Sequence, residues 1–336
     1  MINFKKIPKP FIVAEIGNNH EGSIENAIKL IESAKKSGAD AVKFQIFNPY
    51  RYASPKDVKR ISLLKKFALK KKDLIYLKKK CEEIGIIFFA TPFDLKSAEL
   101  LNKIQSFFKI SSGDNNYFDL LKKVRSFRKP VIISTGLMNY KDILQVITYF
   151  RKFKFYKKRE NLCVMHCVSA YPASKKKINL NSIPYLKKKF PNVTIGYSDH
   201  TLGYKIATLS YLMGSEIIEK HFTLSNNFSS FRDHKISLNP NSFKKFVKEI
   251  KSLKMILGDF CKEINSEEIS NYTLMRRKIV SNKILKKGQK IKKSDFLLVR
   301  SQEKGIEASK INKIKGKKLI KDVDKFDNLL LEDLIK

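Results

Sequence analysis

FIVAEIGNNHEGSIENAIKLIESAKKSGADAVKFQIF, residues 11–47, carries two apolar runs on either side of an amphipathic stretch. The runs at 11–17 and 41–47 are nearly continuous in apolar and β-branched residues, as strands buried on both faces are. Between them, Ser23 can cap a helix that Gly38 ends. The stretch therefore predicts a strand–helix–strand unit in which the two strands are parallel.

The same alternation continues along the chain. Further apolar runs occupy residues 86–93, 107–113, 130–136, 161–170, 193–200 and 216–224. After the first helix, helical patterns lie near 73–85, from Leu95, from Tyr117, from Tyr140, around 179–190, around 203–213 and from Asn241 to Leu257, and a long basic connection leads into the first of these. Eight strand–helix units over about 250 residues predict an α/β fold, a TIM (β/α)8 barrel. A doubly wound sheet is the alternative, but the GxGxxG or Walker signature that it often carries is missing.

The pattern changes after about residue 263. We predict a barrel domain over residues 1–260, a linker with a helix over 261–276, and a last module over 277–336. In that module short apolar pieces are separated by glycine and lysine, which indicates a compact, β-rich unit. A unit of about 60 residues is small enough to need docking on another surface.

The chain is strongly basic, with 69 Lys and Arg against 32 Asp and Glu among 336 residues, a net charge of +37. The lysines are spread in short clusters where helices would face water, and no nucleic-acid-binding motif accompanies them. This pattern favours compositional bias, and we expect no nucleic-acid partner. Positive charge can still attract anionic, phosphorylated substrates.

No apolar run approaches the ~20 residues that cross a bilayer, and the first ten residues, MINFKKIPKP, lack the apolar region of a signal peptide. We therefore expect a cytoplasmic protein with no membrane partner. Cys163 and Cys167 bracket His166, but on a strand these two thiols lie too far apart for tight metal chelation. Buried, reduced thiols are expected.

Charged side chains follow or interrupt several apolar runs. Glu15, Lys43, Lys109 and His221 all lie within or at the ends of predicted strands. An isolated buried charge is costly unless it is paired. A barrel enzyme works at the C-terminal ends of its strands, so groups of both signs at that end indicate an active site.

His200 and His221 end two neighbouring strands of the predicted barrel. Two imidazoles from adjacent strands can converge on one divalent metal, and Glu15 or Asp233 can add a carboxylate or hold a bound water. Asp199 is expected to orient His200 or to cap the following helix.

A second set combines two ammonium groups with several hydroxyls. Its members are Lys43, Thr91, Lys109, Ser112 and Ser134. A phosphate needs positive charge and many donors, so this set predicts a phosphate site. A Schiff-base lysine is the alternative, but the presence of two lysines beside the histidine pair favours phosphate.

Eight short motifs now stand in one order along the chain. They are AEIGNNHEGS (14–23), KFQ (43–45), ATPFD (90–94), FKISSGD (108–114), ISTGLM (133–138), HCVSAYP (166–172), YSDHTLG (197–203) and EKHFTL (219–224). Together they resemble the sialic acid synthase family, which makes nine-carbon sugar acids, over nearly the whole chain. The tail, with KKGQKIKKSDF, Arg300 and GKKL, resembles that family's C-terminal antifreeze-like (SAF) domain.

The resemblance implies that phosphoenolpyruvate condenses with an N-acetylated hexosamine, typically N-acetylmannosamine, and water, releasing phosphate. It implies a divalent cation, usually Mn²⁺ with Mg²⁺ or Co²⁺ as substitutes, bound by His200 and His221. The residues implied to surround phosphoenolpyruvate are Lys43, Thr91, Lys109, Ser112, Ser134 and Ser198. Those implied to face the sugar and the metal-bound water are Glu15, Tyr171 and Asp233. Arg300, from the SAF domain of the other subunit of a domain-swapped homodimer, is implied to reach the acylamino end of the sugar.

Some positions depart from the family's pattern. Phe231-Arg232-Asp233-His234 stands where Gly-Pro-Asp-His is common, and Arg300-Ser301-Gln302 stands where Arg-Pro-Gly is usual. Ser169 occupies a position that is often Asn in enzymes using N-acetylmannosamine. This leaves open a bis-acetamido hexose on the legionaminic or pseudaminic path. Two other readings are a related synthase of seven- or eight-carbon sugar acids and a basic binding protein without catalysis.

Overall fold

The computed structural model describes residues 4 and 6–335. The chain separates into two compact units, Met1–Gly258 and Asp259–Lys336. No helix among the described residues is long and apolar enough to cross a membrane.

The first unit is built on eight parallel strands. In chain order they are β1 (Phe11–Gly17), β2 (Ala41–Ile46), β3 (Ile87–Pro92), β4 (Phe108–Ile110), β5 (Val131–Ser134), β6 (Leu162–Cys167), β7 (Thr194–Asp199) and β8 (Ile217–His221). Their order in the sheet is β3-β2-β1-β8-β7-β6-β5-β4, and β3 also lies against β4, so the sheet is a nearly closed barrel. The predicted (β/α)8 barrel is confirmed.

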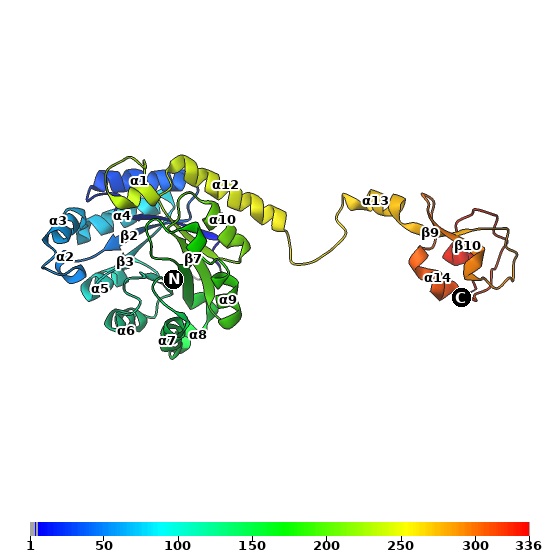
Figure 1. Cartoon of the computed structure of the whole chain (residues 1–336), viewed down its shortest axis with the longest axis horizontal. Helices are drawn as coiled ribbons and strands as arrows, with labels where there is room; N and C mark the ends of the chain where they lie inside the picture. The colour runs from blue at the N-terminus through cyan, green and yellow to red at the C-terminus, as the bar shows by residue number, and fades with distance from the viewer. Residues whose placement is uncertain (1–3, 5, 336) are drawn as a thin grey trace. The chain divides into compact units, whose positions relative to one another are not determined.

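Helices surround the strands (Figure 1). They are α1 (Ile24–Lys36), α2 (Pro49–Tyr52), α3 (Val58–Phe67), α4 (Lys71–Ile84), α5 (Leu95–Ile104), α6 (Phe118–Ser126), α7 (Tyr140–Arg151), α8 (Lys154–Lys157), α9 (Ser182–Lys189), α10 (Lys205–Leu212), α11 (Arg232–Ile236) and α12 (Pro240–Leu257). Ser23 caps α1 by accepting a hydrogen bond from the Asn26 amide, as predicted, and Gly38 follows its end at φ +93°.

The basic connection after β2 contains two helices that the sequence pattern did not indicate, α2 and α3. Asn48 caps α2 and Asp57 caps α3, each by accepting a hydrogen bond from a backbone amide of the first turn. Only Ile61, Leu64 and Phe67 of α3 are buried, and lysines fill much of the rest. A short helix with so narrow an apolar face gives a weak periodic signal.

Alternation along the strands divides the barrel into two layers. One set of alternate residues, such as Ile12 and Ala14 of β1, joins the large core shared with the helices. The other set points into the barrel. At the N-terminal ends of the strands this inner set is apolar, with Phe11, Val13 and Phe89 fully or almost fully buried. Two residues further along each strand, the inner set becomes polar, and there the site lies.

The second unit contains α13 (Glu268–Met275), β9 (Arg277–Ser281), β10 (Phe296–Arg300) and α14 (Ile311–Ile314). The strands β9 and β10 pair antiparallel, and isolated bridges such as Leu285 with Val323 extend the pairing. Its own core is formed mainly by isoleucine, leucine and valine side chains.

Candidate active site

A cavity of about 550 Å³ opens at the C-terminal ends of the barrel strands. The predicted site residues that line it are Glu15, Lys43, Lys109, Ser112, Ser134, Tyr171, Ser198, His200, His221 and Asp233. They come from seven of the eight strands or the segments that follow them, and from α11. The barrel thus brings together groups that are far apart in sequence.

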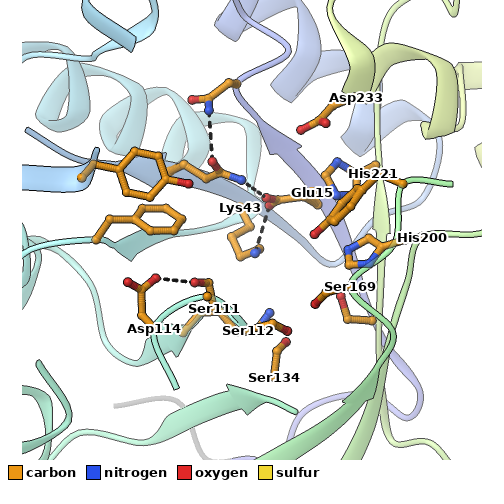
Figure 2. Close-up of a pocket in the computed structure, with 18 of the residues that line it drawn as sticks. Glu15, Lys43, Ser111, Ser112, Asp114, Ser134, Ser169, His200, His221 and Asp233 are labelled. Carbon is orange, nitrogen blue, oxygen red and sulfur yellow. Dashed lines mark hydrogen bonds and ion pairs between the residues drawn. The ribbon is translucent and has the colours of Figure 1, made fainter. Parts of the chain in front are cut away.

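A buried ionic cluster forms one part of the cavity. The Lys43 ammonium lies 3.3 Å from Glu15 Oε2 and 3.2 Å from Glu219 Oε1. Lys109 donates to both oxygens of Glu219 at 3.0 Å. Gln45 donates to the other Glu15 oxygen at 3.0 Å, and Figure 2 shows the Glu15 carboxylate between these donors. Two ammonium groups and two carboxylates therefore balance in charge.

The two carboxyl groups of this cluster differ in their protonation. Burial raises the pKa of Glu15, and the neighbouring Glu219 charge adds to that effect against the attraction of Lys43. Burial also acts on Glu219, but the ammonium groups of Lys109 and Lys43 outweigh it and hold its pKa well below the usual range. Glu219 is thus held as an anion, whereas Glu15 takes up a proton more readily than a carboxyl group in water does.

The two predicted metal-binding histidines lie side by side, with ring centroids 5.4 Å apart (Figure 2). Tyr171 packs on His200 at 4.1 Å between ring centroids. His200 Nδ1 lies 2.9 Å from the Val168 carbonyl oxygen, which leaves Nε2 free to act as a ligand. Burial lowers the pKa of His221 well below its usual value, helped by the charges of His200 and Lys43, so its ring is neutral.

These imidazoles fit a divalent cation. His221 Nδ1 is buried and has no hydrogen-bond partner, and a neutral imidazole beside a second one is a common donor pair. Among the described residues, no group of three or more His, Cys, Asp or Glu side chains is arranged to hold a metal. The two histidines would therefore be the protein's main ligands, with the remaining positions left to small molecules.

The hydroxyl groups do not all face the cavity. Ser112 accepts a hydrogen bond from the Gly136 amide, and Ser112 and Ser134 both line the cavity. Ser198 also lines it, but its hydroxyl donates to Glu219 at 3.0 Å. Thr91 is fully buried behind Lys43, which lies 3.5 Å from its hydroxyl, and does not line the cavity. Thr91 is placed to support Lys43.

Asp233 reaches the cavity from α11, the short helix after β8 (Figure 2). The neighbouring Arg232 contacts its carboxylate at 3.2 Å and stacks over the Tyr171 ring at 4.5 Å. Below them, buried His234 lies 3.3 Å from Glu21 and 2.7 Å from the Thr223 hydroxyl. This network fixes the segment in which the usual Gly-Pro is replaced.

Asp199 does neither of the tasks predicted for it. Its carboxylate pairs with the fully buried Lys220 at 2.9 Å and accepts hydrogen bonds from Tyr197 and from Thr201. None of these bonds involves the ring of His200. The next helix, α10, begins only at Lys205, too far along the chain for Asp199 to cap it. The prediction was wrong because Asp199 alternates with Ser198 and points out of the barrel, where Lys220 provides a closer partner.

The most important residue that the sequence reasoning missed is Glu219. It stands two positions before His221, so a strand places both on the same face. This alternation could have indicated that Glu219 faces the cavity, but residues 216–224 read mainly as an apolar strand. The cavity is also lined by Arg51 and Arg60, from helices that the pattern did not indicate.

Arg300 is the last residue of β10 in the second unit, where it pairs with Arg277 of β9 across the strands. Of the cysteines, Cys81, Cys163 and Cys167 are buried free thiols as expected, but Cys261 is exposed. Cys167 lies 3.8 Å from His200 Nδ1.

Together, the nearly closed barrel, the ionic cluster and the histidine pair at the C-terminal strand ends are the arrangement expected of a TIM-barrel enzyme. The comparisons narrow this class. The chain belongs to the NeuB family, whose model matches residues 30–262.

Two of the relatives below cover almost the full chain. N,N'-diacetyllegionaminic acid synthase of Campylobacter jejuni is 36% identical over 96% of this chain and 99% of its own. Pseudaminic acid synthase of the same species is 30% identical over 98% of both chains. The crystal structure of N-acetylneuraminic acid (sialic acid) synthetase from Leptospira borgpetersenii covers 78% of this chain and 89% of its own, at 34% identity and a TM-score of 0.72. These relatives are sugar-acid synthases, and the present chain is an enzyme of their family.

Proposed function

We propose that this protein is a nonulosonic acid synthase. It condenses phosphoenolpyruvate with an N-acetylated hexosamine, such as N-acetylmannosamine, and water, and it gives a nine-carbon sugar acid and phosphate. The observation that carries the proposal is the pair of buried ammonium groups, Lys43 and Lys109, in one cavity with two adjacent histidines that can bind a metal. Family membership supports it.

The ammonium groups and the hydroxyls of Ser112 and Ser134 suit the phosphate and carboxylate of phosphoenolpyruvate. C3 of phosphoenolpyruvate forms a bond to the aldehyde carbon of the open-chain hexosamine, and C2 becomes electron-deficient. A water oxygen then adds to C2 and loses a proton. The resulting tetrahedral intermediate releases phosphate as the C2–O bond breaks.

Glu15 is the residue that we assign to the proton transfers. Its pKa is raised by burial, it lines the cavity, and its Oε2 has the Lys43 ammonium at 3.3 Å as its ionic partner. A carboxyl group of this kind can accept the proton of the attacking water or return one to the sugar oxygen. Asp233 and Tyr171, which also line the cavity, orient the sugar.

His200 and His221 would hold a divalent cation, Mn²⁺ by preference, with Mg²⁺ or Co²⁺ as substitutes. When bound, such a cation makes the sugar aldehyde more electrophilic. The chain's own part is to fix both imidazoles: burial keeps His221 neutral, and the Val168 carbonyl holds Nδ1 of His200.

A bis-acetamido hexose is the second candidate acceptor, as on the legionaminic or pseudaminic path. The 36% identity to the Campylobacter diacetyllegionaminic acid synthase favours it. Ser169, a small residue, lines the cavity with a buried hydroxyl that has no partner. A second acetamido group would have both space and a hydrogen-bond donor there.

A further part of the proposal concerns the second unit, residues 259–336. We assign it as an SAF domain that completes the site of a partner in a domain-swapped cytoplasmic homodimer, with Arg300 reaching the acylamino group. The exposed apolar side chains of the connecting segment, such as Phe260 and Ile264, are consistent with burial in such a dimer.

Phosphate release tests the proposal. The full chain is incubated with phosphoenolpyruvate, Mn²⁺ and each of a panel of N-acetylated and bis-acetamido hexoses, with and without chelator. We expect release that depends on one hexose, and a product with the mass of that hexose plus pyruvate. The hexose that reacts decides between the two acceptors. Absence of release with every hexose would refute the proposed function.

A further inference from the structure

Glu219 is the only carboxylate of the described cavity that contacts both of its lysines. It lies 3.2 Å from the Lys43 ammonium and 3.0 Å from that of Lys109, and Ser198 donates a third contact at 3.0 Å. Its side chain is 6% exposed, and those of its two lysine partners are 6% and 2% exposed. Glu219 is therefore a bridge between two cations that water hardly screens.

Glu216, just before the same strand, is a matched carboxylate with different surroundings. Glu216 precedes β8 at the opposite end of the barrel, and it also pairs with two cations, Lys9 and Arg159. Those cations have side chains that are 37% and 35% exposed. Glu216 does not line the cavity. Its ion pairs join surface segments, whereas the Glu219 pairs face the site.

Two ammonium groups close to one carboxylate would repel each other and move apart without it. Glu219 holds both at fixed positions, but it also offsets part of their positive charge. Its removal therefore has two opposed effects on an incoming anion. The anion meets a stronger positive field, yet it meets lysines whose positions are no longer fixed.

We propose that Glu219 is a positioning residue: it fixes Lys43 and Lys109 so that the bound anion is aligned for reaction, at the expense of anion affinity. This inference rests on the proposed function for the identity of the anion. Glu219 acts through the lysines and does not touch the substrate. Ser198 supports it through its hydrogen bond, and not by contacting phosphoenolpyruvate directly.

The test compares the wild type with Glu219→Gln, Glu219→Asp and the matched control Glu216→Gln, all as full chains. Calorimetry with phosphoenolpyruvate, and separately with inorganic phosphate, measures anion affinity. Steady-state kinetics give kcat and both KM values. Since a misplacement of about 1 Å can cost about 10²-fold in rate, we expect Glu219→Gln to lose about 10²-fold in kcat. We expect its anion affinity to rise, by up to about tenfold, and its hexosamine KM to change little.

The other two variants separate positioning from folding. Glu219→Asp keeps the charge on a shorter side chain, so we expect it to recover part of kcat and the wild-type anion affinity. Glu216→Gln is expected to lower the melting temperature and to leave kcat and both KM values within about twofold, because its pairs lie away from the site. A purely structural role for Glu219 would give the same pattern as Glu216→Gln.

Two results would overturn the inference: a Glu219→Gln variant with wild-type kcat, or one that loses anion affinity and kcat in parallel. Failure of the proposed function looks different. In that case the wild type binds the anion but turns over no hexosamine. Anion affinity alone then decides the inference. A higher anion affinity of Glu219→Gln supports it, and a lower one refutes it. A wild type that binds neither anion would refute both.

Discussion

At the N-terminal ends of the strands, the inside of the barrel is filled by side chains such as Phe11, Phe89 and Phe107, all essentially inaccessible to water. At the C-terminal ends, two residues further along the same strands, the corresponding inward positions include Thr91 and Lys109. The backbone pairing is the same at both ends. One end of this barrel therefore contributes mainly to stability through apolar packing, and the other holds charged groups at fixed positions. Substitutions at the two ends can affect stability and activity separately.

The largest expected effect lies at the polar end. Lys109→Gln removes one of the two ammonium groups and leaves Glu219 with Lys43 alone. Truncating one partner of a buried charge pair costs about 2–5 kcal/mol, so we expect kcat/KM for phosphoenolpyruvate to fall by about 10³-fold. Circular dichroism should show a folded barrel. Turnover within tenfold of the wild type would remove Lys109 from the anion site.

The matching change at the apolar end is Phe89→Ala. Phe89 is fully buried and packs on Phe107 with ring centroids 4.5 Å apart. The cavity left behind should lower the free energy of unfolding by about 3–5 kcal/mol. Kinetics at a temperature where the variant is folded should give kcat within about twofold of the wild type. A large loss of kcat with unchanged stability would show that the apolar end of the barrel also determines activity.

The sequence was sufficient to predict the barrel, because strands buried on both faces alternate with helices eight times. Most of the predicted site residues do line the cavity, since the strand ends can be read from the apolar runs. The sequence did not reveal the roles within the cavity. The sequence predicts that Lys43 and Lys109 bind a phosphate. It does not show that Glu219 pairs with both of them, because this contact forms only when β2, β4 and β8 come together in the fold.

Asp199 and Thr91 are two residues for which the sequence predicts a place in the site that the structure does not give them. Each lies at a strand end and suits a site by residue type. The direction of Asp199 is set by the alternation of β7, and its partner Lys220 lies on the neighbouring strand. Thr91 points inward but lies one layer below the cavity. Strand ends predicted to within one or two residues cannot resolve such differences.

Glu15→Gln probes the chemistry at the polar end with a smaller expected effect. The amide can keep the contact with Gln45 but cannot accept a proton. General acid–base catalysis contributes about 10²–10⁴-fold, so we expect kcat to fall by at least about 10²-fold while both substrates still bind. Kinetics and calorimetry on the same preparation measure this. Near-normal turnover with normal binding would exclude Glu15 from proton transfer.

The smallest effect concerns a buried group outside the cavity, His20, which packs near Phe44 and accepts a hydrogen bond from the Gly22 amide. Burial lowers its pKa to about 4 from 6.5. The unfolded chain therefore binds a proton that the folded chain does not between pH 6.5 and about 4, so stability is full above 6.5 and is lost as the pH falls through this window.

We expect this one group to contribute on the order of 2 kcal/mol to the pH dependence of unfolding. Urea unfolding of the wild type and His20→Gln at pH 7 and pH 4.5 measures it. The variant should lose less stability between the two values than the wild type does. Equal losses would show that His20 titrates normally in the folded protein.

The polar end of the barrel is proposed to bind phosphoenolpyruvate against Lys43 and Lys109, beside a metal held by His200 and His221. A crystal structure of the full chain soaked with phosphoenolpyruvate and Mn²⁺, with anomalous data at the manganese edge, tests this directly. We predict one anomalous peak in contact with both imidazoles and phosphoenolpyruvate density in contact with both ammonium groups. Phosphoenolpyruvate bound away from the two lysines, or manganese bound away from the two histidines, would contradict the account.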